Sequence, residues 1–208
     1  MKVLLSTAYW PNLHYFFYVL NADSVCIEHY ENYQKQSFRN RTQILTANGK
    51  LDLSIPVNKT APKIFTKDVT ISYQEKWQIK HWRAITSAYK NSPYFEHFES
   101  EIEPFYLQEY ESLSEYNSMQ LKTVLKILKI KRQLSFSSDY IKTAENLLDR
   151  RESIHPKKEF QSDEKVVERL KHHYYQTFEN KFEFVPNLSV LDLLFNTGLG
   201  TIEYLSIE

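Results

Sequence analysis

The sequence predicts an α/β fold, with a mixed sheet begun by a βαβ unit and containing an Asn-Gly hairpin, and with a mostly helical second half. Three patterns indicate this fold: strand, helix and strand in succession at the N-terminus, an Asn-Gly pair between two strand-like runs, and apolar residues at helical spacing after Trp77. A chain of 208 residues is typical of one domain. We therefore expect residues 1–208 to form a single domain.

The first element is a short buried strand over residues 3–8. Pro11 and Asn12 then open a helix that reaches about Leu20, with Asn12 as a plausible N-cap. Residues 24–28 form the next apolar strand. Two strands joined by a helix at this spacing indicate a right-handed parallel βαβ unit.

The hairpin is predicted over residues 41–47 and 51–57, which flank Asn48–Gly49. Asn-Gly is the strongest short hairpin signal, because both residues of the tightest turn adopt positive φ. Residues 67–73 alternate polar and apolar side chains, which predicts a further strand.

Helices dominate the remaining pattern. Residues 77–90 carry one apolar stripe at four-residue spacing, and residues 112–130 begin with the capping-box pair Ser112 and Glu115. Between residues 131 and 164 apolar residues thin out, so we expect loops and short elements. Residues 189–196 form a short helix that ends at Gly198.

Composition excludes several classes of function. The 26 basic and 26 acidic residues cancel, which argues against a dedicated nucleic-acid binder. Three glycines, at positions 49, 198 and 200, cannot supply a Walker loop or a GxGxxG turn. A single cysteine, Cys26, and no apolar run long enough to span a bilayer predict a cytoplasmic protein without a membrane span. Neither a cofactor nor an oligomeric state is indicated.

A group of cations and amides before the hairpin is the leading candidate site. Lys35, Arg39 and Arg41 lie among amide side chains that include Asn40. In an extended strand Arg39 and Arg41 share one face, where they could bind a phosphate or carboxylate group. The alternative is a solvated edge strand whose cations pair with acids such as Glu28 or Glu31.

The stripe of the helix after Trp77 supplies a second set of candidates. His81 is a candidate general acid or base, because the pKa of histidine lies near working pH. Trp77 and Tyr89 could wall a pocket with their aromatic faces. The alternative is that His81 is a hydrogen-bonded core residue and the aromatic side chains are packing.

A third set follows the first strand, where open α/β sheets place ligands. Tyr9, Asn12 and His14 lie there, although a helix N-terminus with incidental polar residues explains them equally well. The adjacent pair His172–His173 does not predict a metal site, because neighbouring residues point in different directions and no spaced ligand completes the set.

At these residues the chain resembles the WbqC-like family. The resemblance is carried in order by Tyr9–Trp10–Pro11–Asn12 with Tyr15–Phe16, Tyr33–Gln34–Lys35, Arg39–Asn40–Arg41–Thr42–Gln43–Ile44, Leu53–Ser54–Ile55–Pro56–Val57, Trp77 with His81–Trp82, Ser87–Ala88–Tyr89, Ser92–Pro93–Tyr94–Phe95, Tyr175–Gln176–Thr177–Phe178, and residues 184–196. It is weak between residues 131 and 164.

The resemblance implies a place in bacterial surface-polysaccharide (O-antigen-type) or nucleotide-sugar biosynthesis, with transfer of an amino-acid or acyl group to an amino sugar as the suggested reaction. Together with the cation–amide group, it predicts a transferase that binds an anionic small molecule bearing phosphate or carboxylate. The alternative is a non-catalytic binding or assembly protein of the same pathway.

Overall fold

The computed structural model describes residues 1–59, 61–142, 146–158 and 164–207. The α/β class is confirmed, but the strands form two sheets and not one mixed sheet. Four strands in the order β5-β2-β1-β6 make a parallel sheet, and β3 and β4 make a separate antiparallel pair. The strands are β1 (Lys2–Ser6), β2 (Ser24–Glu28), β3 (Arg41–Thr46), β4 (Gly49–Ser54), β5 (Gln133–Phe136) and β6 (Leu148–Asp149).

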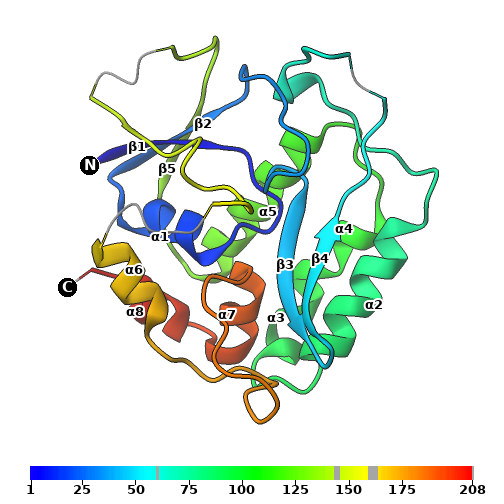
Figure 1. Cartoon of the computed structure of the whole chain (residues 1–208), viewed down its shortest axis with the longest axis vertical. Coiled ribbons are helices and arrows are strands. Elements are labelled where there is room, and N and C mark those ends of the chain that lie inside the picture. The colour runs from blue at the N-terminus through cyan, green and yellow to red at the C-terminus, as the bar shows by residue number, and fades with distance from the viewer. Residues whose placement is uncertain (60, 143–145, 159–163, 208) are drawn as a thin grey trace.

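The predicted βαβ unit consists of β1, α1 (Leu13–Asn21) and β2, and Lys2 lies opposite Ser24 in the parallel register. The Asn12 side chain caps α1 by accepting a hydrogen bond from the Tyr15 backbone N–H. Residues 13–20 of this helix are all buried. A helix that is apolar on every side is covered on every side, and Figure 1 shows α1 between the parallel sheet and the C-terminal helices.

The hairpin turns one residue earlier than predicted. Thr46 pairs with Gly49, so Ala47 and Asn48 occupy the turn. Gly49 has φ of 100°, whereas Asn48 does not adopt positive φ. The positive φ therefore falls on the glycine after the turn, and the prediction that both turn residues adopt positive φ does not hold for Ala47 and Asn48.

The strand predicted over residues 67–73 is wrong. This segment begins with a 3₁₀ turn, η1 (Thr66–Asp68), and then makes two isolated bridges, Thr70 with Ser112 and Ile71 with Val57. The Ile71 backbone N–H donates to the Glu111 carbonyl. The alternating polarity of this segment therefore does not mark a strand, because the segment pairs with described residues only through single bridges, to Val57 on one side and to Ser112 on the other.

The helical second half is confirmed. Its helices are α2 (Trp77–Tyr89), α3 (Phe95–Ile102), α4 (Pro104–Leu107), α5 (Leu113–Ile127), α6 (Glu164–Lys171), α7 (Val190–Thr197) and α8 (Gly200–Leu205). Within the described ranges, no helix is long and apolar enough to cross a membrane. Two short strands, β5 and β6, come from the stretch after residue 131 and complete the parallel sheet.

The hairpin lies beside α2 and α7, as Figure 1 shows, and β3 makes contacts with these two helices. Ile44, Leu53 and Ile55 are almost fully buried there. The open end of the hairpin, where Arg41 pairs with Ser54, is thereby brought to the N-terminal turns of α2. This junction positions the site described below.

Gly198, the residue after α7, tests the close packing of this region. Its φ is 59°, and an added Cβ would lie 2.7 Å from the Tyr94 ring. We expect Gly198→Ala to lower the free energy of unfolding by about 1–3 kcal/mol, measured by urea denaturation. Gly200→Ala is the control, because its Cβ would have no neighbour closer than 3.6 Å. Equal effects of the two substitutions would contradict this account.

Candidate functional site

A pocket of about 420 Å³ opens between the hairpin and α2. Three segments build it: the loop between β2 and β3, the open end of the hairpin with the chain that follows, and the first turns of α2. Five of the residues proposed from sequence meet in it. The lining residues are Tyr33, Lys35, Gln36, Asn40, Arg41, Ser54, Ile55, Pro56, Val57, Glu75, Trp77, Lys80 and His81.

Local geometry explains why these side chains converge. Trp77, Lys80 and His81 stand three and four residues apart, so they share one face of α2. Arg41 begins β3 opposite the last residue of β4, Ser54. Gln36 adopts φ of 55°, which turns the loop back toward the hairpin.

The described lining residues carry three cations, Lys35, Arg41 and Lys80, and one carboxylate, Glu75. Arg41 is 3.1 Å from Asp52 and donates to the Ser54 hydroxyl, and Lys80 is 3.3 Å from Glu75. These ion pairs are partly exposed and therefore weak. Lys35 is exposed, and within the described part of the chain its ammonium has no ion-pair partner. The pocket consequently has a positive charge available to an anion.

His81 lies at the inner wall of the pocket and is buried. Its Nδ1 is 2.9 Å from the Tyr9 hydroxyl, and the ring also has a hydrogen bond to the Ser54 backbone. The edge of the Trp77 ring packs against it at 5.1 Å between centroids. His81 is thus a hydrogen-bonded buried residue, as the second sequence-based alternative has it, and it also borders the pocket. Its role as a general acid or base stays a prediction.

Burial, with a smaller contribution from Lys80, lowers the pKa of His81 to about 4. The imidazole is therefore neutral at pH 7. A standing imidazolium that protonates a leaving group is incompatible with that pKa. His81 brings a neutral ring to the pocket, which can accept or donate a hydrogen bond.

Among the residues that the structure describes, two on the pocket wall have a buried polar atom without a hydrogen-bond partner, Trp77 Nε1 and Asn40 Oδ1. The Asn40 amide nitrogen is already bound to the Ile55 carbonyl at 2.9 Å, so its oxygen is the atom left over. A buried polar atom without a partner costs about 1–3 kcal/mol. Such atoms are rare in folded proteins and are often explained by function.

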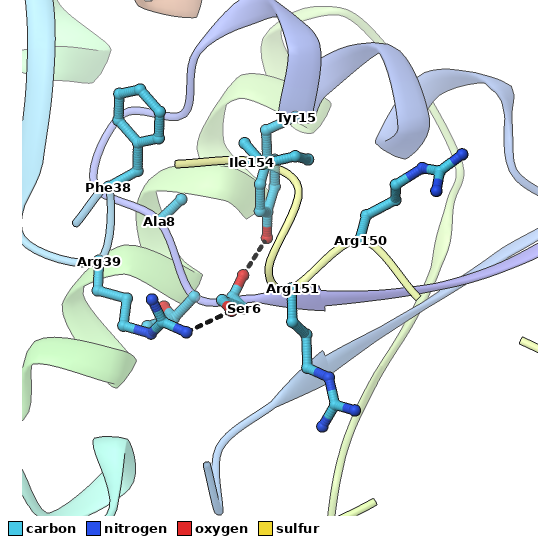
Figure 2. Close-up of a pocket in the computed structure, with 9 residues that line it drawn as sticks. Ser6, Ala8, Tyr15, Phe38, Arg39, Arg150, Arg151 and Ile154 are labelled. Atoms are coloured by element: carbon cyan, nitrogen blue, oxygen red, sulfur yellow. Dashed lines mark hydrogen bonds between the residues drawn. The ribbon is translucent and has the colours of Figure 1, made fainter. Parts of the chain in front are cut away.

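Arg39 is not part of this pocket, which corrects its proposed place beside Arg41. Residues 35–40 form turns and β3 begins only at Arg41, so the two side chains do not share a strand face. Arg39 is 2% exposed and binds Glu31 through two hydrogen bonds of 2.8 and 2.7 Å. It also donates to the Ser6 hydroxyl at the end of β1, as Figure 2 shows. The alternative named Glu31 as a partner, and Arg39 does pair with it, but in a buried turn and not on a solvated edge strand.

Tyr89 is also placed elsewhere. It is fully buried, and its hydroxyl donates to Asp192 at 2.8 Å. The residues proposed after β1 are buried as well: Asn12 caps α1, and the His14 backbone N–H donates to the Asn187 side chain. Tyr9 has a link to the pocket through its hydrogen bond with His81.

The carboxyl end of the parallel sheet holds ion pairs, and Glu31, Asp149 and Arg151 also line a hollow of about 160 Å³ there. Arg151 binds Glu28 at 3.2 Å and Asp149 at 2.6 Å, next to the pair formed by Arg39 and Glu31. A second hollow between these groups measures about 10 Å³, the size of one water molecule. Arg150 and Arg151 line it from the segment after β6, and their guanidinium groups point away from each other (Figure 2).

Several lining residues were not predicted from sequence. Lys80 could have been found, because it lies on the same helix face as Trp77 and His81. Tyr33, Pro56 and Val57 enter the pocket through loop conformations that have no periodic signal. Within the described ranges, no three His, Cys, Asp or Glu side chains come together as a metal site.

The two neighbouring arginines should differ sharply in their effect on stability. Arg39→Met leaves Glu31 buried without its partner, which we expect to lower the free energy of unfolding by about 3–5 kcal/mol. Arg41→Met removes a partly exposed pair and should change it by less than about 1 kcal/mol. Urea denaturation of both variants measures the difference, and a similar loss in the two would refute the separate roles.

The pH dependence of stability tests the environment of His81. Between the unfolded pKa of 6.5 and the folded pKa of about 4, His81 binds more protons in the unfolded chain, so its own contribution to stability falls as pH drops through this window. The contribution of His81 is on the order of 3 kcal/mol. His81→Gln should flatten the curve of unfolding free energy against pH by that amount, whereas the control His97→Gln, at an exposed position, should not. A wild-type curve parallel to that of His81→Gln would contradict the burial argument.

One family model matches the chain. The WbqC-like protein family matches residues 7–155, a range that contains every lining residue of the pocket. The uncharacterised protein Rv1507c of Mycobacterium tuberculosis is 26% identical over 222 residues, covering 97% of this chain and 96% of the relative. No solved structure matches. The chain belongs to the WbqC-like family.

Proposed function

We propose that the pocket between the hairpin and α2 binds an anionic small molecule that bears a phosphate or carboxylate group. The observation that supports this most strongly is the convergence of Lys35, Arg41 and Lys80 on one hollow of about 420 Å³. Guanidinium and ammonium groups bind such anions through charge-assisted hydrogen bonds. A volume in this range suits a small molecule.

The geometry also suggests how the ligand would lie. The cations stand on the loop, on the hairpin and on the second turn of α2, so they would hold the charged end of the ligand toward solvent. Trp77 and His81 form the deeper wall, where an uncharged ring or amide of the ligand would pack. Asn40 would orient the ligand from the side of the hairpin.

We further propose a transferase of bacterial surface-polysaccharide or nucleotide-sugar biosynthesis, which transfers an amino-acid or acyl group to an amino sugar. Membership of the WbqC-like family supports the pathway, and the cationic pocket supports a phosphorylated or carboxylated substrate. His81 would bring its neutral imidazole to the reacting end of the ligand. A cytoplasmic location fits this proposal, because activated sugars are made there.

A binding or assembly protein of the same pathway is the second candidate. The observation that favours it is the pKa of His81, since a ring with a pKa of about 4 is a weak base at neutral pH. Incubation with nucleotide-sugars, amino acids and ATP, followed by mass spectrometry, separates the two. A product supports the transferase, and binding without any product supports the second candidate.

Binding of UDP-N-acetylglucosamine and of pyrophosphate, measured by isothermal titration calorimetry, tests the pocket. We expect Lys35→Met and Arg41→Met each to weaken binding by about tenfold, because each removes one charge-assisted contact. Lys50→Met is the matched control, since Lys50 is an exposed cation of the same hairpin that does not line the pocket.

The outcome depends on the contrast between the three variants. Equal weakening in Lys50→Met would indicate attraction to the overall charge of the hairpin. Unchanged affinity in both pocket variants would remove the pocket as the anion site.

A further inference from the structure

A row of hydrogen bonds runs from the segment after β1 to the pocket. The Trp10 indole Nε1 donates to the Tyr106 hydroxyl at 2.8 Å, the Tyr106 and Tyr9 hydroxyls are 3.0 Å apart, and the Tyr9 hydroxyl is 2.9 Å from His81 Nδ1. All four side chains are buried. We call these four residues the relay.

The donor at the far end of the relay is fixed. An indole N–H can only donate, so the Tyr106 oxygen must accept from Trp10. Trp10 itself has φ of 34°, which is uncommon for so large a residue. Its backbone is held by Gln120, which accepts from the N–H, and by the hydroxyls of Thr42 and Ser189, which donate to the carbonyl. The strained backbone is therefore held in place from three sides.

Each hydroxyl then has one proton to place. Within the described residues, the Tyr106 hydroxyl has hydrogen bonds to Trp10 and Tyr9 alone, so its proton points to the Tyr9 oxygen. The Tyr9 hydroxyl oxygen accepts this hydrogen bond, and the Tyr9 O–H donates to His81 Nδ1. If the row were reversed, the Tyr106 proton would be left without an acceptor in a buried place, at a cost of about 1–3 kcal/mol.

We propose that Tyr9 is a positioning residue that holds His81 in the neutral form with its proton on Nε2. Because Nδ1 accepts from Tyr9, the single proton of the neutral ring is left to Nε2. The other hydrogen-bonding neighbour of the ring is the Ser54 backbone, which raises the pKa of His81 and therefore accepts the Nε2–H. The single N–H of His81 is thus donated to Ser54 at the inner wall of the pocket.

This assignment limits the chemistry available to the ligand. The lone pair of Nδ1 is occupied by Tyr9, and Nε2 has no lone pair to offer, so His81 does not act as a general base. A ligand acceptor, such as a phosphate or carbonyl oxygen, would have to share the Nε2–H with the Ser54 backbone or replace it. The consequence for the ligand rests on the proposed function, whereas the position of the ring proton is a property of the free protein.

Long-range ¹H–¹⁵N correlation spectra of the histidine-labelled protein without ligand test the proposal at neutral pH. The chain has 7 histidines, and loss of one ring in His81→Gln assigns the signals. We expect wild-type Nδ1 at the shift of an unprotonated nitrogen and Nε2 at that of a protonated one. A proton on Nδ1 in the wild type overturns the proposal, even if no variant folds.

Tyr9→Phe separates positioning from packing, because it removes one oxygen and keeps the ring. We expect both nitrogen signals of His81 to move to intermediate shifts as the two tautomers interchange. Tyr116→Phe is the matched control, since its ring stacks on Tyr9 while its hydroxyl bonds to the Phe105 carbonyl. Unchanged His81 shifts in Tyr9→Phe, or equal shifts in the two variants, would show that Tyr9 does not hold the tautomer.

This experiment is independent of ligand binding. If the calorimetric titrations show no binding while the spectra place the ring proton on Nε2, the proposed function is rejected and the role of Tyr9 stands. If ligands bind while the spectra place the proton on Nδ1, the role of Tyr9 is rejected and the proposed function stands.

Discussion

The buried ion pair between Arg39 and Glu31 is the interaction on which the pocket depends. Two nearly parallel hydrogen bonds join the groups, and Ser6 at the end of β1 completes the contact. A buried arginine without such partners would strongly destabilise the folded protein. The pair therefore fixes the loop between β2 and β3 against the end of the parallel sheet. Asn117 secures the same point by donating to the Arg39 carbonyl at 2.7 Å.

The position of this loop determines the orientation of its neighbours. Asn40 follows Arg39 and exchanges backbone and side-chain hydrogen bonds with Ile55, which ties the loop to the end of the hairpin. Arg39 points into the protein, whereas Lys35 and Arg41 line the pocket beside α2. Arg39, which the sequence places beside the pocket cations, thus does not line the pocket but holds the loop that carries Lys35. The carboxyl end of the sheet, the usual ligand crevice of an open α/β fold, carries the ion pair of Arg39 and that of Arg151 with Glu28, beside the hollow of about 160 Å³.

The sequence predicted the elements whose signals are local. The βαβ unit, the α2 stripe and the caps by Asn12 and Ser112 depend on neighbours a few residues away. The separation of the two sheets depends on contacts across the whole chain, and so does the pairing of β5 and β6. Alternation alone could not show that residues 67–73 lack an adjacent strand. Local rules therefore predicted the elements better than their partners.

For the site, too, the sequence predicted the features that depend on residue type and not those that depend on the course of the backbone. Residue type identified Lys35, Asn40, Arg41, Trp77 and His81, which line one pocket. It could not distinguish Arg39 from Arg41, because the backbone turns between them and only one has a buried acid within reach. Nor could it show that Tyr89 faces Asp192 in the core. The chemistry of a side chain is visible in sequence, whereas its direction depends on the turn that carries it.

The most direct test of the central claim is a crystal structure of the protein with pyrophosphate bound. The account predicts the anion between the hairpin and α2, within hydrogen-bond distance of Lys35 and Arg41. Pyrophosphate bound only at the carboxyl end of the parallel sheet, among Arg39, Arg150 and Arg151, would contradict it, because the ion pairs there would have to open to admit an anion.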